Sequence, residues 1–240
     1  DMMAGVNVKS IPDFSVEGKS DEASFNRVRD EVIQAVSFAS ENSCIPFVVF
    51  KPSGMGEPAI YEKVSSRAKM TRLELDEFEA VRKRYFAVAE ECNQYNIPFF
   101  VDAEESWMQE AIDELVKELS AKYNKGKTLV YNTLQMYRTD RLNYLAEAVE
   151  TAKAEGFSVG FKLVRGAYLE KERERAGELN IPSPVFETKE GTDRAYNDAL
   201  QFCFAHRDHV SVCAATHNED SARLLTDLIT KEGIVSDDKR

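Results

Sequence analysis

Two cations at the end of one apolar run form the strongest chemical signal in the sequence. Lys162 lies inside the run Val159–Val164, and Arg165 and Gly166 follow directly. A cation inside a buried strand must be paired or must face a ligand. A glycine beside it lets the backbone approach that ligand closely. The cluster therefore indicates a functional site rather than a purely structural one.

Two further apolar runs also end in charged residues. Lys51 ends the run Phe47–Lys51 and could hold a carboxylate, or it could be a solvated strand end. Asp102 follows the second run and could accept a hydrogen bond from a cofactor or fix a lysine, or it could cap a helix. Glu104 and Glu105 follow closely and are alternative candidates for the same role. Asp102 is favoured because the alternation of side chains directs it away from Val101.

Weaker polar signals follow two other runs. Gln135 offers an amide donor and acceptor, which suits the edge of a planar heterocycle. Thr216, His217 and Asn218 end the last run, and Thr216 and His217 could donate to phosphate or ribose oxygens. No carboxylate-rich ligand set accompanies the histidine at metal spacing, so the sequence predicts no metal site.

These residues are positioned by strands that alternate with helices along the whole chain. Polar groups at the ends of many strands favour an α/β barrel, and no GxGxxG motif supports a dinucleotide-binding open sheet. About six strand–helix units are predicted, whereas a closed (β/α)8 TIM-type barrel has eight. The predicted strands are Ile11–Val16, Phe47–Lys51, Phe99–Ala103, Thr128–Thr133, Val159–Val164 and Val210–Ala215.

The helices are predicted from the spacing of apolar residues and from end signals. The first, Asp21–Asn42, has Phe25, Val28, Val32, Val36 and Ala39 on one face. The helix predicted over about 138–155 ends at Gly156, a favourable C-cap. Glu170–Thr192 is predicted to be a polar loop. The other predicted helices cover about 57–69, 74–95, 108–123, 138–155, 193–205 and 220–232.

Composition restricts the classes of partner and compartment. The 240 residues carry a net charge of -11, and an acidic surface repels nucleic acid. The four cysteines show no paired spacing, which suggests free thiols in a reducing compartment. The sequence contains neither a transmembrane stretch nor a signal-peptide pattern, so we expect a protein that is not secreted.

Seven segments occur in series along the chain: Asp13–Lys19, Phe50–Lys51, Val101–Glu104, Tyr131–Tyr137, Lys162–Tyr168, Thr188–Asp193 and Ala215–Asn218. Together they resemble the proline dehydrogenase family, closer to its stand-alone or eukaryote-like branch than to the bifunctional bacterial enzymes. We therefore interpret residues 1–240 as one proline dehydrogenase-like barrel domain that is incomplete at its C-terminus.

The resemblance implies FAD across the C-terminal mouth of the barrel. It places Lys51 on the carboxylate of L-proline, Asp102 and Lys162 in the catalytic centre, and Tyr168 near the substrate ring. Many relatives have arginine where this chain has Lys162, so the fork of a guanidinium is replaced by a point charge. The implied cofactor contacts are Ala103, Gln135, Lys162, Val164, Arg165, Gly166, Ala167, Thr216, His217 and Asn218.

The implied activity is that of an oxidoreductase of proline catabolism. Hydride transfer from L-proline to N5 of FAD gives Δ1-pyrroline-5-carboxylate, and the electrons pass to a quinone, with peripheral membrane contact. The implied location is the bacterial cytoplasm and inner-membrane periphery, or the mitochondrial matrix and inner membrane. The family's last two strand–helix units, with an arginine pair that binds the proline carboxylate, find no match here, and Glu17 lacks the arginine that it pairs with in the family.

Three alternatives stay open at this point. The first is a hydroxyproline dehydrogenase, which differs only in the substrate pocket. The second is a Schiff-base aldolase on the same barrel, with Lys51 or Lys162 as the nucleophile. The third is a catalytically inactive, truncated barrel.

Overall fold

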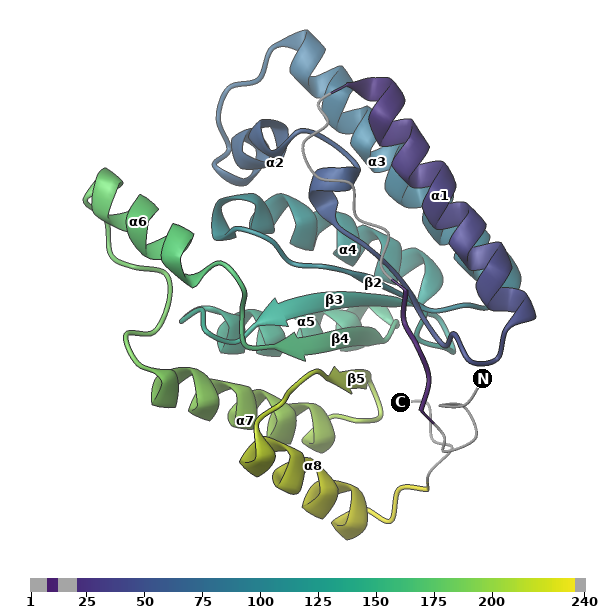
Figure 1. The fold of residues 1–240 in the computed structure, drawn as a ribbon, viewed down its shortest axis with the longest axis vertical. Coiled ribbons are helices and arrows are strands. Elements are labelled where there is room, and N and C mark those ends of the chain that lie inside the picture. The colour runs from purple at the N-terminus through teal and green to yellow at the C-terminus, as the bar shows by residue number, and fades with distance from the viewer. Residues whose placement is uncertain (1–7, 13–20, 236–240) are drawn as a thin grey trace. The chain divides into compact units, whose positions relative to one another are not determined.

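Short parallel strands alternate with longer helices along the chain (Figure 1). The structure is a computed structural model that describes residues 8–12 and 21–235. The order of the strands in the sheet follows the order of the chain. This arrangement confirms the predicted α/β class with parallel pairing. The strands are β1 (Val48–Phe50), β2 (Phe99–Val101), β3 (Val130–Gln135), β4 (Val159–Val164) and β5 (Val210–Ala214).

The described residues hold five strands, one fewer than predicted. The five lie within two residues of the predicted boundaries. The remaining candidate, Ile11–Val16, falls for the most part on positions 13–16, which lie outside the described residues, and Ile11 and Pro12 form no strand.

The chain divides into two compact units. Unit 1 is Asp1–Tyr123 with Leu129–Asn132, and unit 2 is Asn124–Thr128 with Thr133–Arg240. Unit 1 contains α1 (Glu22–Glu41), the 3-10 turn η2 (Pro52–Gly54), α2 (Pro58–Ser65), α3 (Arg72–Tyr95), the 3-10 turn η3 (Ser106–Met108) and α4 (Gln109–Tyr123). Unit 2 contains α5 (Arg141–Glu155), α6 (Leu169–Leu179), α7 (Lys189–Ala205) and α8 (Glu219–Lys231). In the part of the chain that is described, none of these helices is both long and apolar enough to cross a bilayer.

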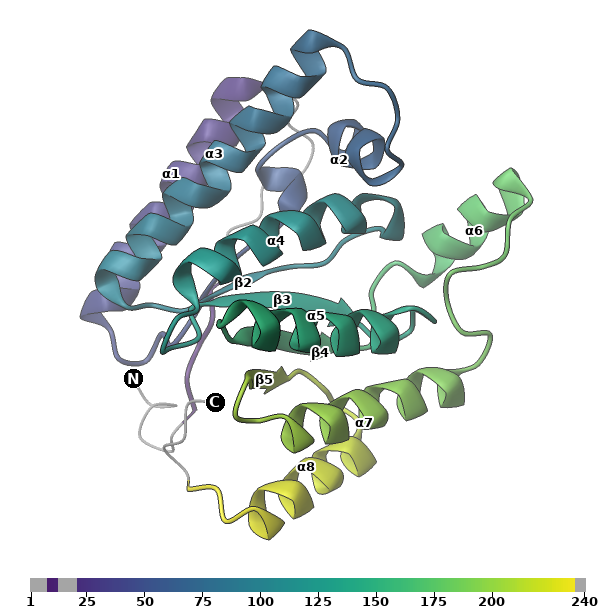
Figure 2. The same ribbon diagram turned by 180° about the vertical axis from the view of Figure 1, so that it is seen from behind.

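Helix α1 shows how local signals and packing agree in unit 1. The Asp21 carboxylate accepts a hydrogen bond from the backbone N–H of Ser24 at 2.8 Å, which is a standard N-cap. The five apolar residues predicted to share one face are all buried. That face packs along α3, and both views show the two helices side by side (Figures 1 and 2). Helix α3 begins with a capping box formed by Thr71 and Glu74.

Aromatic side chains fill the core beneath β1 and β2. All six residues of the two strands are buried, as expected for parallel strands covered on both faces. The Phe50 ring contacts the Tyr85 ring edge to face at 4.9 Å between centroids, and it lies 6.0 Å from the Phe99 ring. Such pairs stabilise a core beyond the area that they bury.

Unit 2 is built on the pairing of β4 with β5, in which Lys162 is opposite Cys213. Helix α5 ends at Gly156, whose φ of +75° is left-handed, so the predicted C-cap is confirmed. Helix α8 packs beside α7 (Figure 2).

The predicted polar loop over Glu170–Thr192 is wrong in part. Its first half forms α6, and α7 begins at Lys189, where Thr188 accepts a hydrogen bond from the Gly191 N–H at 3.2 Å. Helix α6 is rich in Glu, Arg and Leu, which favour helix, but it buries only Glu172 and Ala176. Because it has no apolar stripe, a search for periodicity does not find it.

The close contact at Gly56 gives a test of the packing in unit 1. A Cβ atom at Gly56 would overlap Cγ2 of the buried Val81. We expect Gly56→Ala to lower the free energy of unfolding by about 1–3 kcal/mol, the usual cost of overpacking. Gly177→Ala is the control, because its Cβ meets nothing within 4 Å. In helix α6 it should raise stability by roughly 0.5–1 kcal/mol. Urea unfolding measures both, and equal stabilities would contradict the packing described here.

Candidate functional site

Lys51 and Asp102 emerge from the carboxyl ends of two neighbouring strands in unit 1. Lys51 directly follows β1, and Asp102 directly follows β2. The two strands are in register at Phe50 and Val101, and the Asp102 N–H donates to the Phe50 carbonyl at 3.0 Å. Both charged side chains are half-buried. The carboxyl end of a parallel sheet is where α/β proteins place reacting groups, and both residues lie there.

Glu104 is a carboxylate that the sequence reasoning passed over in favour of Asp102. It is only 6% exposed, and both of its oxygens accept hydrogen bonds from Ser53, one from the backbone N–H and one from the hydroxyl, each at 2.7 Å. Burial raises the pKa of Glu104, and the hydrogen bonds from Ser53 and the charge of Lys51 offset this only in part. The spacing of two residues from Asp102 was the available signal, since residues i and i+2 of an extended segment share a face.

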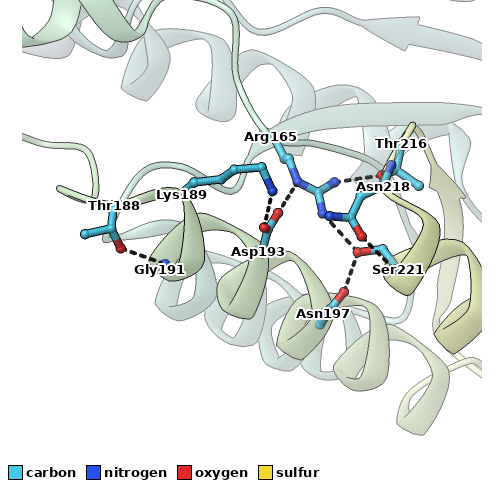
Figure 3. A network of polar contacts seen from close by, with 9 residues as sticks. All are labelled: Arg165, Thr188, Lys189, Gly191, Asp193, Asn197, Thr216, Asn218 and Ser221. Atoms are coloured by element: carbon cyan, nitrogen blue, oxygen red, sulfur yellow. Dashed lines mark hydrogen bonds and ion pairs between the residues drawn. The ribbon is translucent and has the colours of Figure 1, made fainter.

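In unit 2, Arg165 is the centre of a polar network at the end of β4 (Figure 3). Its Nε donates to Asp193 at 2.6 Å, its Nη1 to Thr216 at 2.7 Å and its Nη2 to Ser221 at 2.9 Å. The guanidinium also lies 4.4 Å from the centre of the Tyr196 ring. Arg165 therefore ties α7 and the turn between β5 and α8 to the end of β4.

The turn between β5 and α8 is fixed by the same network. The Thr216 hydroxyl also accepts from the Asn218 N–H at 3.0 Å. Asn218 caps α8 by accepting from the Ser221 N–H at 3.0 Å, and the Ser221 hydroxyl donates to Asn197 at 2.6 Å. Thr216 and Asn218 thus have a structural role. Their predicted contact with the cofactor stays a prediction.

The charges around Arg165 are balanced locally. Asp193 accepts from Arg165 and also pairs with Lys189. Burial alone would raise the pKa of Asp193, but the two hydrogen-bonded cations outweigh it and lower that pKa. Burial raises the pKa of Tyr196 to about 12, although the charge of Arg165 opposes the shift. Sequence reasoning missed Asn197 and Ser221, because both are common helix-surface residue types.

Gly166 and Gln135 make contacts within the protein. Gly166 has a φ of +135°, and a Cβ there would lie 2.6 Å from three atoms of the Tyr137 ring. Its lack of a side chain thus serves both the backbone turn and the approach of Tyr137. Gln135 is 2% exposed, and its side-chain oxygen accepts from the Ala167 N–H at 3.2 Å.

The other predicted contacts lie on the same strand ends. Lys162 is half-buried on β4, and its charge partly offsets the rise that burial causes in the pKa of Cys213. The carbonyl of Val164 accepts from the Met136 N–H at 2.8 Å. Tyr168 is half-buried at the start of α6, and His217 is exposed after β5.

The donor set of unit 2 fits FAD, the cofactor that the resemblance implies. Gly166 and Ala167, which directly follow Arg165, are exposed, as is His217 after β5, and the cations Lys162 and Arg165 are half-buried. A guanidinium has five N–H donors, and three nitrogens of Arg165 each use one within the protein, so donors remain for an anionic or carbonyl-bearing ligand. Ala103, in unit 1, is half-buried beside Asp102. The part of the chain that is described holds no group of three or more His, Cys, Asp or Glu side chains placed to bind a metal ion.

Comparison with known proteins places the chain in a family. The family model "Proline dehydrogenase" matches residues 3–239. The carbapenem antibiotics biosynthesis protein CarD of Pectobacterium carotovorum subsp. carotovorum is 31% identical over 223 residues, which are 93% of this chain and 58% of that protein. The mitochondrial proline dehydrogenase 1 of Arabidopsis thaliana is 36% identical over 193 residues, or 78% and 38%. The chain spans about half the length of the first curated relatives that it matches.

Solved structures agree on the fold. Proline utilization A from Bdellovibrio bacteriovorus, inactivated by N-propargylglycine, matches with a TM-score of 0.83 at 16% identity, over 98% of this chain and 25% of that one. A mutant of proline utilization A from Bradyrhizobium japonicum matches with a TM-score of 0.80 at 22% identity, over 92% and 23%. These likenesses confirm the predicted α/β fold of the TIM-barrel type.

The Arg165 network can be tested by keeping the charge and removing the fork. In Arg165→Lys a single ammonium replaces the three guanidinium nitrogens that donate to Asp193, Thr216 and Ser221. We therefore expect the free energy of unfolding to fall by about 2 kcal/mol. Arg223→Lys on the surface of α8 is the matched control, since its side chain is 73% exposed. It should change stability by less than about 0.5 kcal/mol. Urea unfolding followed by circular dichroism measures both, and similar small losses would show that the network does not stabilise unit 2.

Proposed function

Because the chain belongs to the proline dehydrogenase family, we propose that it oxidises L-proline to Δ1-pyrroline-5-carboxylate with bound FAD. The observation that carries the proposal is the match to the family model over residues 3–239. The positions of Lys51 and Asp102 support it, since both lie at the carboxyl ends of neighbouring strands, where such a barrel carries its reacting groups.

Lys51 is proposed to bind the substrate carboxylate. An ammonium–carboxylate hydrogen bond is among the stronger polar contacts, and it would fix the position of the ring. Asp102 is proposed to orient a lysine rather than to take a proton. Its backbone is held to Phe50, the residue directly before Lys51, so the two charged residues have a short structural connection. Tyr168 is proposed to lie against the substrate ring.

The cofactor is proposed to be held by residues at the strand ends. FAD, when bound, supplies the acceptor for the two electrons that leave the substrate. Lys162 would favour negative charge on its ligand, because a preorganised cation in a half-buried position is weakly screened. The substrate amine must lose its proton for its lone pair to assist the oxidation. The other proposed contacts are Ala103, Gln135, Val164, Arg165, Gly166, Ala167, Thr216, His217 and Asn218.

The proposed final acceptor is a quinone, reached by peripheral contact with a membrane. Several relatives from eukaryotes are named as mitochondrial proteins. This favours a location at the matrix side of the mitochondrial inner membrane, or at the cytoplasmic face of a bacterial inner membrane.

The visible absorption spectrum of the purified chain tests the proposed function. We expect flavin bands that lose their intensity when L-proline is added without oxygen, because the two electrons then stay on the cofactor. trans-4-Hydroxy-L-proline should bleach the flavin bands more slowly than L-proline does. Faster bleaching by trans-4-hydroxy-L-proline would identify the chain as a hydroxyproline dehydrogenase instead. Flavin bands that persist with both would indicate a site that binds the cofactor without turnover. A chain without flavin that borohydride traps on a carbonyl substrate would instead be a Schiff-base enzyme.

Substitution of Lys51 tests the proposed substrate contact. Lys51→Met keeps the length of the side chain and removes the charge, so the KM for L-proline should rise by roughly 10–100-fold, the worth of one charge-assisted hydrogen bond. Lys69→Met, on an exposed segment, is the matched control and should leave the KM unchanged. Steady-state assays with an artificial acceptor measure both. An unchanged KM in Lys51→Met would remove Lys51 from the substrate site.

A further inference from the structure

The turn that follows β1 is held from the helices of unit 1. The turn begins with Lys51 and continues through η2. The buried hydroxyl of Tyr61 donates to the Pro52 carbonyl at 2.8 Å, and Nη1 of the buried Arg84 donates to the Met55 carbonyl at 3.0 Å. These contacts come from α2 and α3, and they fix the part of the turn that lies after Lys51.

Glu104 holds the same turn from the strand side. Its two oxygens accept from the backbone N–H and the hydroxyl of Ser53, two residues after Lys51. Glu104 itself follows Asp102 by two residues. The bidentate contact therefore joins the segment that carries Lys51 to the segment that carries Asp102, in addition to the backbone bond from Asp102 to Phe50.

Stability alone is a poor reason for a carboxylate at this position. Removing a carboxylate from water costs several kcal/mol, and a buried polar arrangement often stabilises a fold no better than apolar residues of similar size. What a bidentate hydrogen bond adds is a fixed geometry. The contact between Glu104 and Ser53 fixes the turn that begins at Lys51. The charge of Lys51 acts to lower the pKa of Glu104 against the effect of burial, which shows that the two groups interact.

We propose that Glu104 is a positioning residue, which holds Lys51 in place for substrate binding by clamping Ser53 and so tying the turn after β1 to the segment after β2. The inference deepens the proposed function and rests on the role given there to Lys51. Glu104 acts through hydrogen bonds to Ser53 and does not touch the substrate.

Kinetics separate positioning from simple stability. In Glu104→Ala we expect the KM for L-proline to rise about tenfold while kcat changes by less than about twofold, because a displaced binding group weakens binding without altering the electron acceptor. Glu104→Gln should rescue the KM to within about threefold, since its amide can accept from the Ser53 N–H and donate to the Ser53 hydroxyl. Glu110→Ala removes an exposed carboxylate on α4 and is the control.

Two measurements without substrate complete the test. Hydrogen exchange of the Ser53 amide, followed in a peptide covering residues 48–57, should be faster in Glu104→Ala and near the wild-type rate in Glu104→Gln. Acetylation of Lys51, measured by mass spectrometry against Lys69 in the same molecule, should speed up in Glu104→Ala as the turn loosens. A melting curve for each variant shows that it is folded.

The outcomes distinguish this inference from the proposed function. Unchanged exchange at Ser53 in a folded Glu104→Ala variant would overturn the clamp. Faster exchange with an unchanged KM, or with unchanged acetylation of Lys51, would overturn the link to Lys51. If the wild-type chain does not oxidise L-proline, the proposed function fails, and the exchange and acetylation rates alone decide whether Glu104 holds Lys51.

Discussion

Strands buried on both faces leave their carboxyl ends as the places where polar side chains can gather, and each polar group there must find a partner. All residues of β1 and β2 are buried, so the chain carries its first charged groups of this region at Lys51 and Asp102. In unit 2 the same constraint applies at Arg165, directly after β4. The cost of an unpaired buried charge explains why each of these strand ends is accompanied by a network rather than by a single residue.

The two units meet this constraint with different residue types. In unit 1 a buried carboxylate, Glu104, accepts from one serine. In unit 2 a guanidinium, Arg165, donates to three side chains from two helices and a turn. A carboxylate can join two close backbone segments, whereas the longer arginine fork can join elements that are farther apart. Each residue type suits the distance that its network spans.

Sequence patterns predicted the parts of the fold that local physics determines. The apolar stripe of α1 and the C-cap at Gly156 are such cases, and both agree with the structure. Helix α6 was missed because its stability comes from propensity and not from an apolar face. Glu104 was missed because its neighbour Asp102 has the same chemistry. The tertiary contact with Ser53, which lies 51 residues earlier in the chain, and the deeper burial of Glu104 distinguish the two carboxylates.

The structure gives different surroundings to the two cations at the end of β4, Lys162 and Arg165. Lys162 lies within β4, whereas Arg165 follows Val164, the last residue of the strand. Arg165 is taken up by Asp193, Thr216 and Ser221, and its exposed neighbours have small or no side chains. Lys162 is the register partner of Cys213 on β5. A lysine suits that position, because a compact ammonium delivers charge without demanding the several acceptors that a second guanidinium would need. Arg165 therefore holds the framework of unit 2 through its three contacts, whereas Lys162 contributes a charge beside Cys213.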